Sequence, residues 1–163
     1  MSLAIRDVEP RDAGAIVRIY NRYIRDTIVT FEEDEISAAD MAARIAHVRA
    51  SLPWIVAEQG GAILGYAYAR KFHERAAYRN TVESTIYVDE AAQRKGIGTN
   101  LYTALLDRLR AQGLRTALAL IALPNAPSVA LHEKCGFKKA AHLEKVGFKF
   151  GRWIDVGYWQ LLL

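Results

Sequence analysis

The sequence has few of the residues that mark a disulfide scaffold, a metal site or a membrane protein. Its only cysteine, Cys135, excludes an internal disulfide, and neither C-x-x-C nor H-E-x-x-H occurs. His132 lies three residues before Cys135, but two possible ligands do not make a zinc site. No uninterrupted apolar stretch reaches the roughly 18 residues of a membrane span. We therefore expect no metal site and no membrane insertion.

The sequence also lacks targeting signals and concentrated charge. Residues 1–6 have no long apolar core of the kind a signal peptide requires and are typical of a short strand, so the cytoplasm is the default location. The net charge is +4, from 22 Lys and Arg against 18 Asp and Glu, but no run of five or more basic residues occurs. Scattered charge of this kind gives no support for nucleic-acid binding.

Length and composition are those of a globular protein. At 163 residues the chain fits one domain with its own core, and we expect a single domain over residues 1–163. Apolar residues make up 52% and charged residues 25%, which disfavours disorder and coiled coil. There are no internal repeats, linkers or low-complexity tracts.

Hydrophobic periodicity predicts alternating groups of strands and helices. The expected helices cover residues 10–23, 37–50, the stretch from the glycine turn at 96 to Gly113, and 128–134. The expected strands cover residues 1–6, 54–58, 63–70, 81–88, 116–123, 137–146 and 153–162. The strand at 116–123 is nearly all apolar, which is typical of a fully buried strand. This order predicts an α+β fold with helices packed on a mixed sheet.

A basic, glycine-spaced turn follows the strand at 81–88 and opens a helix. Gly96 and Gly98 allow a tight turn, so that successive backbone N–H groups can converge on phosphate oxygens at the positive end of the helix dipole. Arg94 and Lys95 add positive charge beside them. The pattern predicts a pyrophosphate-binding loop.

Two common phosphate loops do not fit this turn. No G-x-x-x-x-G-K-[ST] occurs, which argues against a P-loop. The third glycine of a dinucleotide fingerprint is replaced by Leu101, and no acidic residue stands about 20 residues further on, so NAD is a poor fit. What remains is Q-x-x-G-x-G, from Gln93 to Gly98.

Glu83 is the first candidate for chemistry. Strand alternation places it on one face with Thr81, Thr85 and Tyr87, inside a strand and not in a solvated turn. A carboxylate there can accept a proton from an ammonium substrate, directly or through water. The alternative is an ordinary strand glutamate or an ion-pair partner.

Further candidates are polar residues after the strand at 116–123 and before the strand at 81–88. His132 is a second possible proton carrier or a helix histidine bonded to backbone. Asn125 and Ser128 can bond a ligand or cap a helix. Arg75 can clamp a carboxylate or phosphinate with Tyr78 adding a hydroxyl, unless residues 72–78 are only a solvated connection.

Taken together, these segments resemble a known superfamily. The Gln93–Gly98 loop and the segment from Leu123 to Phe137 resemble the coenzyme A-contacting segments of the GNAT N-acetyltransferases. Longer sequence segments resemble those of one branch, the phosphinothricin and methionine sulfoximine acetyltransferases: residues 52–58, 78, 81–88, 123–125, 131–133 and 146–160.

The resemblance implies a fold, a reaction and a partner. The expected fold has a central mixed, mostly antiparallel sheet, splayed between the parallel strands 81–88 and 116–123, with helices on both faces. Acetyl-coenzyme A would be the donor, and the α-amino group of a small glutamate-like or methionine-like acid would be the acceptor. Transfer would be direct, in a ternary complex, and the protein would be a homodimer active in detoxification.

The resemblance also implies roles for individual residues. Glu83 would be the base, with His132 as a second catalytic candidate. His73 stands where some relatives have lysine, which leaves the preferred acceptor open. Donor contacts would be Ile86, Tyr87, Val88, Arg94, Lys95, Gly96, Ile97, Gly98, Thr99, Asn125 and Ser128. Acceptor contacts would be Phe72, His73, Arg75, Tyr78, Thr81, Val82 and Glu83.

Two other functions remain open from the sequence. The same donor could serve a different amine, such as a protein N-terminus, a polyamine or an antibiotic. The chain could also be a non-catalytic acyl-coenzyme A-binding module, although the presence of Glu83 weighs against it.

Overall fold

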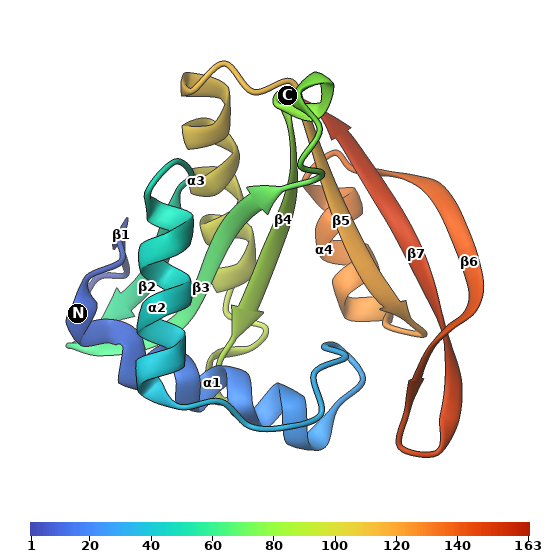
Figure 1. Cartoon of the computed structure of the whole chain (residues 1–163). Coiled ribbons are helices and arrows are strands. Elements are labelled where there is room, and N and C mark those ends of the chain that lie inside the picture. The colour runs from blue at the N-terminus through green and yellow to red at the C-terminus, as the bar shows by residue number, and fades with distance from the viewer.

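Seven strands form one sheet in the computed structural model, which describes residues 1–163 (Figure 1). The strand order is β1-β2-β3-β4-β5-β7-β6, and every neighbouring pair is antiparallel except β4 and β5. The strands are β1 (Ala4–Asp7), β2 (Trp54–Gln59), β3 (Ala62–Lys71), β4 (Thr81–Val88), β5 (Thr116–Leu123), β6 (Lys138–Lys149) and β7 (Arg152–Leu162). The predicted mixed, mostly antiparallel sheet is confirmed.

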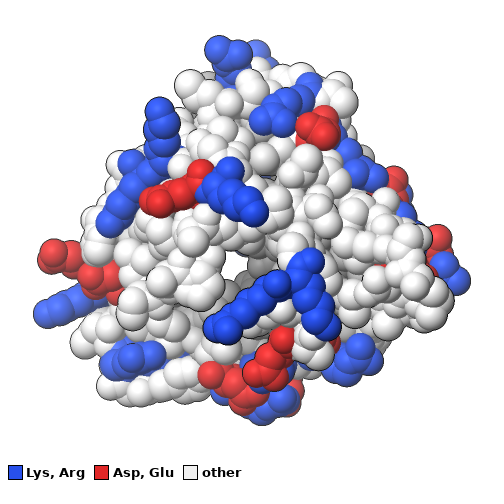
Figure 2. Space-filling model, turned by 180° about the vertical axis from the view of Figure 1, so that it is seen from behind, with Lys and Arg blue, Asp and Glu red and all other residues white.

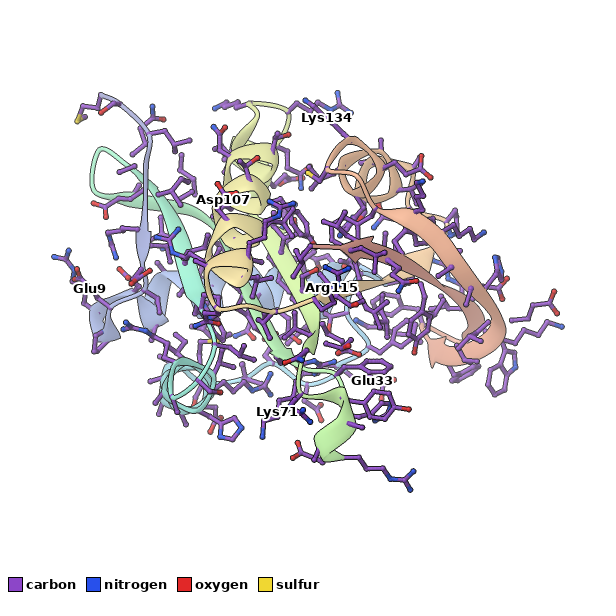
Figure 3. The ribbon with its side chains drawn as sticks, turned by 90° about the horizontal axis from the view of Figure 1, so that it is seen from above. Glu9, Glu33, Lys71, Asp107, Arg115 and Lys134 are labelled. Carbon is purple, nitrogen blue, oxygen red and sulfur yellow. The ribbon has the colours of Figure 1, made fainter.

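Four α-helices cover the two faces of the sheet. They are α1 (Ala13–Asp26), α2 (Ala38–Arg49), α3 (Ile97–Ala111) and α4 (Ala126–Lys134). The apolar residues of α1 and α2 pack on one face, and those of α3 and α4 pack on the other, so each face has its own core. Seen from above, α3 with Asp107 lies across the sheet from α2 (Figure 3).

Local sequence signals account for most element ends. Ser37 and Asp40 form the predicted capping box at the start of α2. Gly60 and Gly61, both with positive φ, form the two-residue turn between β2 and β3. The first helix begins later than predicted, because Pro10–Asp12 forms a separate 3₁₀ turn.

The sheet opens between its two parallel strands. β4 pairs with β5 only over Thr81–Glu83, opposite Thr116–Leu118, although both strands continue for five more residues. The edge of β4 from Ser84 to Val88 therefore has no strand partner on the β5 side, as the splayed arrangement predicts. The two arrows visibly diverge in Figure 1.

The prediction that β5 is buried throughout is wrong. Leu120 is exposed, and Leu118 is only half-buried. The divergence of the strands explains the exposure of Leu120: beyond Leu118, β5 has no strand neighbour on the β4 side, and Leu120 borders the opening. An apolar sequence does not distinguish these two surroundings.

Candidate active site

A cleft of about 260 Å³ lies where β4 and β5 part. Several residues singled out in the sequence line it: Glu83, Ile86, Tyr87, Asn125, Ser128 and His132. The rest of the lining comes from the segment after α1 and from β3, β4, β5 and β7: Val29, Thr30, Phe31, Arg70, Ser84, Thr85, Leu120, Ile121, Ala122 and Val156. From behind, the surface is pierced near its centre, with basic side chains beside the hole (Figure 2).

Glu83 is the carboxylate of this cleft. Its side chain is only 13% exposed, and its Oε2 accepts a hydrogen bond of 2.6 Å from Nε of Arg70. The two residues are directly opposite each other on β4 and β3. Burial acts to lower the pKa of Arg70, but the charge and the hydrogen bond of Glu83 outweigh it and the pKa is raised. The base candidate is thus held in place by a cation.

His132 is buried, at 4% exposure, and both of its ring nitrogens have partners. Nδ1 lies 2.6 Å from the carbonyl oxygen of Ser128, which can only accept, so Nδ1 carries the proton. Nε2 then accepts from the hydroxyl of Tyr102 at 2.7 Å. Tyr102 in turn lies 2.8 Å from the hydroxyl of Ser84 on β4.

This chain of hydrogen bonds favours a neutral imidazole. Burial lowers the pKa of His132 below its ordinary value of 6.5, and the bond to the Ser128 carbonyl only partly opposes this. Burial also raises the pKa of Tyr102, which keeps its hydroxyl protonated as a donor. His132 therefore connects α4 to β4 through Tyr102 of α3.

The predicted pyrophosphate loop has the geometry of an anion site. Gly96 adopts φ 76°, and α3 begins at the next residue. The N–H groups of Ile97, Gly98 and Thr99 have no acceptor within the helix, as at any helix start. A Cβ on Gly98 would meet Leu131 of α4 at 3.1 Å and Ile86 of β4 at 3.8 Å, so the glycine brings this helix end close to the cleft wall.

The free edge of β4 leads from this loop toward Glu83. The N–H of Asp89 donates to Leu64 on β3, so strand alternation turns the N–H and C=O of Val88 to the opposite side. There the Val88 carbonyl accepts from the Tyr23 hydroxyl at 2.6 Å. The backbone N–H of Ile86 points to the same side as that of Val88, so both N–H groups lie along the opening as hydrogen-bond donors.

Asn125 has a structural role here. It is the N-cap of α4, and its side chain accepts from the N–H of Ser128 at 3.3 Å. Both residues also border the cleft, so the capping role and a ligand contact are compatible. The helix starts two residues earlier than predicted, because Pro127 fits the first turn.

The predicted acceptor contacts are more dispersed. The rings of Phe72, His73 and Tyr78 form a cluster on the loop after β3, with Phe72 edge-to-face to the other two, while Arg75 is exposed on that loop. None of these four lines the cleft of this chain. The side chain of Val82 is buried in the core, which leaves only its backbone available to a ligand.

Two parts of the cleft were missed from the sequence. Arg70 is the partner of Glu83, and Val29, Thr30 and Phe31 form a wall after α1. Strand pairing gives Arg70 its position, and the only local signal was a basic residue at the end of an apolar strand. The described residues contain no cluster of three His, Cys, Asp or Glu side chains that could hold a metal ion, and no helix with the length and apolarity to cross a bilayer.

A sheet parted between parallel strands, a glycine turn at the adjoining helix and a carboxylate in the opening together characterise an acyltransferase that uses an acyl-coenzyme A. Residues 5–157 match the family described as acetyltransferase (GNAT) domain. The chain belongs to this family of acetyltransferases.

Relatives of known name share most of the chain. A phosphinothricin N-acetyltransferase of Streptomyces viridochromogenes is 41% identical, over 96% of this chain and 85% of its own. An L-methionine sulfoximine/L-methionine sulfone acetyltransferase of Pseudomonas paraeruginosa is 38% identical, over 100% and 96%. The solved phosphinothricin acetyltransferase of Sinorhizobium meliloti, in complex with acetyl-coenzyme A, has a TM-score of 0.96 at 38% identity, covering 100% of this chain and 89% of that one.

Proposed function

We propose that this protein transfers acetyl from acetyl-coenzyme A to the α-amino group of a small amino acid of the phosphinothricin, methionine sulfoximine or methionine sulfone type. The observation that carries the proposal is the position of Glu83, a carboxylate inside the cleft where β4 and β5 separate. The names of relatives that span nearly the whole chain support the class of acceptor. The cytoplasm is the expected compartment.

The donor side of the site suits a coenzyme A arm. The free N–H groups at the start of α3, with Arg94 and Lys95 beside them, would bind the pyrophosphate. The unpaired edge of β4 offers Ile86 and Val88 backbone groups to the peptide-like arm, much as a strand would. Solved relatives in complex with acetyl-coenzyme A support this reading.

Glu83 would act as the general base. It accepts a proton from the acceptor ammonium, directly or through water, because only the free amine has a lone pair. The nitrogen then forms a bond to the thioester carbonyl carbon, and the carbon–sulfur bond breaks. Of the two protons that the nitrogen loses, one ends on the thiol of coenzyme A and the other goes to solvent.

The backbone N–H of Val88 would stabilise the oxyanion of the tetrahedral intermediate. This N–H faces the opening, and one such donor typically lowers the activation barrier by ~3 kcal/mol. His132 would position α4 and β4 instead of shuttling protons, since both of its nitrogens are already bonded.

We also propose that a second copy of the chain covers the β6–β7 hairpin. Five large apolar side chains are exposed on it: Leu143, Val146, Phe148, Phe150 and Trp153. Phe150 occupies a hairpin turn at φ 52°, where glycine or asparagine is usual, so an aromatic ring is retained there despite backbone strain. Phe31 of the cleft wall packs against Gly147, so the hairpin lies beside the cleft.

Release of the coenzyme A thiol tests the function. Phosphinothricin, methionine sulfoximine and methionine sulfone are the acceptors, with spermidine and a short peptide as competing amines. We expect release with at least one of the three amino acids and little with the others. Release only with spermidine or the peptide would contradict the acceptor class, and binding of acetyl-coenzyme A without release would indicate a non-catalytic module.

A further inference from the structure

The ion pair of the cleft has an unusual asymmetry. Among the residues that line the cleft, Arg70 and Glu83 are the only formally charged side chains when His132 is neutral. Glu83 is 13% exposed, whereas Arg70 is 60% exposed. The acid is therefore fixed within the wall, and the guanidinium reaches it from the open side.

Arg70 uses only part of its hydrogen-bonding capacity. Its Nε donates to Glu83, and its two terminal nitrogens donate no hydrogen bond to another protein group. Arg70 also borders a second, wider hollow between α2 and the sheet, together with Tyr68 and Lys71. The free donors thus lie between the base and the space through which an acceptor could reach it.

A free amino acid has the complementary pair of charges. Its ammonium must approach Glu83 to lose a proton, and its carboxylate is attached to the same carbon as the nitrogen. Glu83 and Arg70 stand side by side, with 2.6 Å between the bonded atoms. A guanidinium is suited to bind a carboxylate through two parallel hydrogen bonds.

We propose that Arg70 binds the α-carboxylate of the acceptor while Glu83 receives its ammonium, which makes Arg70 a specificity-determining residue. This inference rests on the proposed function and deepens it. The internal ion pair is exchanged for two pairs with the zwitterion. An amide, a peptide N-terminus or a polyamine has no carboxylate next to the amine, and would leave Arg70 without its partner.

The test compares methionine sulfone with its α-carboxamide, which keeps the amine and loses the carboxylate. We expect Arg70→Gln to lower kcat/KM for methionine sulfone by about 10- to 100-fold, mainly through KM, in the range for losing a charge-assisted hydrogen bond. The value for the carboxamide should fall by a clearly smaller factor, because that acceptor loses only the support that Arg70 gives to Glu83. Arg70→Lys keeps the charge without the planar fork and should fall between wild type and Arg70→Gln.

Arg110→Gln is the matched control, because Arg110 lies on α3, pairs with Asp107 and is remote from the cleft lining. Equal losses for both acceptors would overturn the inference and leave Arg70 as a residue that only positions Glu83. No loss for either would overturn it as well. If the wild type releases thiol with neither acceptor but does so with spermidine, that result contradicts the proposed function, and the role of Arg70 is rejected with it.

Discussion

Lys149 at the end of β6 donates a hydrogen bond of 2.8 Å to the backbone carbonyl of Thr30. The same ammonium donates to the carbonyls of Ile24 and Thr27, also at 2.8 Å each, and it is only 2% exposed. Its partners are the last turn of α1 and the segment that follows, where the helix carbonyls have no N–H donor within the helix and the helix dipole is negative. Lys149 thus holds one wall of the cleft against the β6–β7 hairpin.

Replacing this lysine should loosen that wall. Lys149→Met leaves three inward carbonyls without their donor, and we expect the free energy of unfolding to fall by about 2 to 4 kcal/mol. Because Thr30 and Phe31 line the cleft, the acceptor KM should rise while donor affinity stays near wild type. Urea denaturation and steady-state kinetics measure the two effects. Lys138→Met, exposed on the same strand, is the control, and equal behaviour of the two variants would contradict the assignment.

Replacing Glu83, the proposed base, should lower turnover without changing donor affinity. Glu83→Gln keeps the shape of the side chain, so calorimetry should give a coenzyme A affinity within about twofold of wild type, whereas kcat near neutral pH should fall on the order of 10² or more. The deficit should shrink at alkaline pH, because solvent then supplies free amine. Asp107→Asn on α3 removes a remote carboxylate and should have neither effect. Unchanged turnover in Glu83→Gln would exclude Glu83 as the base.

The buried imidazole should give a measurable pH dependence of stability. The pKa of His132 is lower in the folded state than its ordinary 6.5, so its contribution is complete above that value. As the pH falls from 6.5 toward the lower pKa of the folded protein, the unfolded state binds a proton that the folded state does not, and this contribution to stability is lost. Denaturation between about pH 5 and pH 7 should show this decline.

His132→Gln removes the titrating group and should flatten the decline over the same interval. His47→Gln, an exposed substitution on α2, is the control and should keep the wild-type profile. An unchanged slope in His132→Gln would mean that another group causes the decline.

The proposed dimer can be tested on one exposed ring. Trp153 pairs with Phe148 across the hairpin, with ring centroids 5.0 Å apart, and is 63% exposed. Trp153→Lys should convert the dimer to a monomer in analytical ultracentrifugation, because a buried lysine without a partner is costly at an interface. Leu162→Lys changes a residue of β7 that is also 63% exposed but lies beyond the part of β7 that pairs with β6, and should leave the dimer intact. A wild-type monomer would refute the proposal.

Local patterns were sufficient for much of the fold and part of the site. The Gly96–Gly98 turn was predictable because positive φ and a helix start depend on a few neighbouring residues. The strand position of Glu83 followed from period-2 alternation, and the divergence of β4 from β5 followed from the family resemblance.

Contacts between distant segments were not predictable in this way. Arg70 meets Glu83 only because of the register between β3 and β4, which the connecting loop determines. Lys149 reaches Ile24, which is 125 positions away in the chain. The Leu120 side chain is exposed because β4 has moved away from β5, and no property of the β5 sequence itself reports the position of its neighbour.

The separation of the two parallel strands has a consequence for evolution. In the proposed function, the donor would contact mostly main-chain groups, which point substitutions do not remove, whereas the acceptor would contact individual side chains such as Arg70 and Phe31. Duplicated copies of such a gene can therefore diversify in the amines they modify and keep the same acyl donor. A change of acceptor would then require few substitutions, most of them on one side of the molecule.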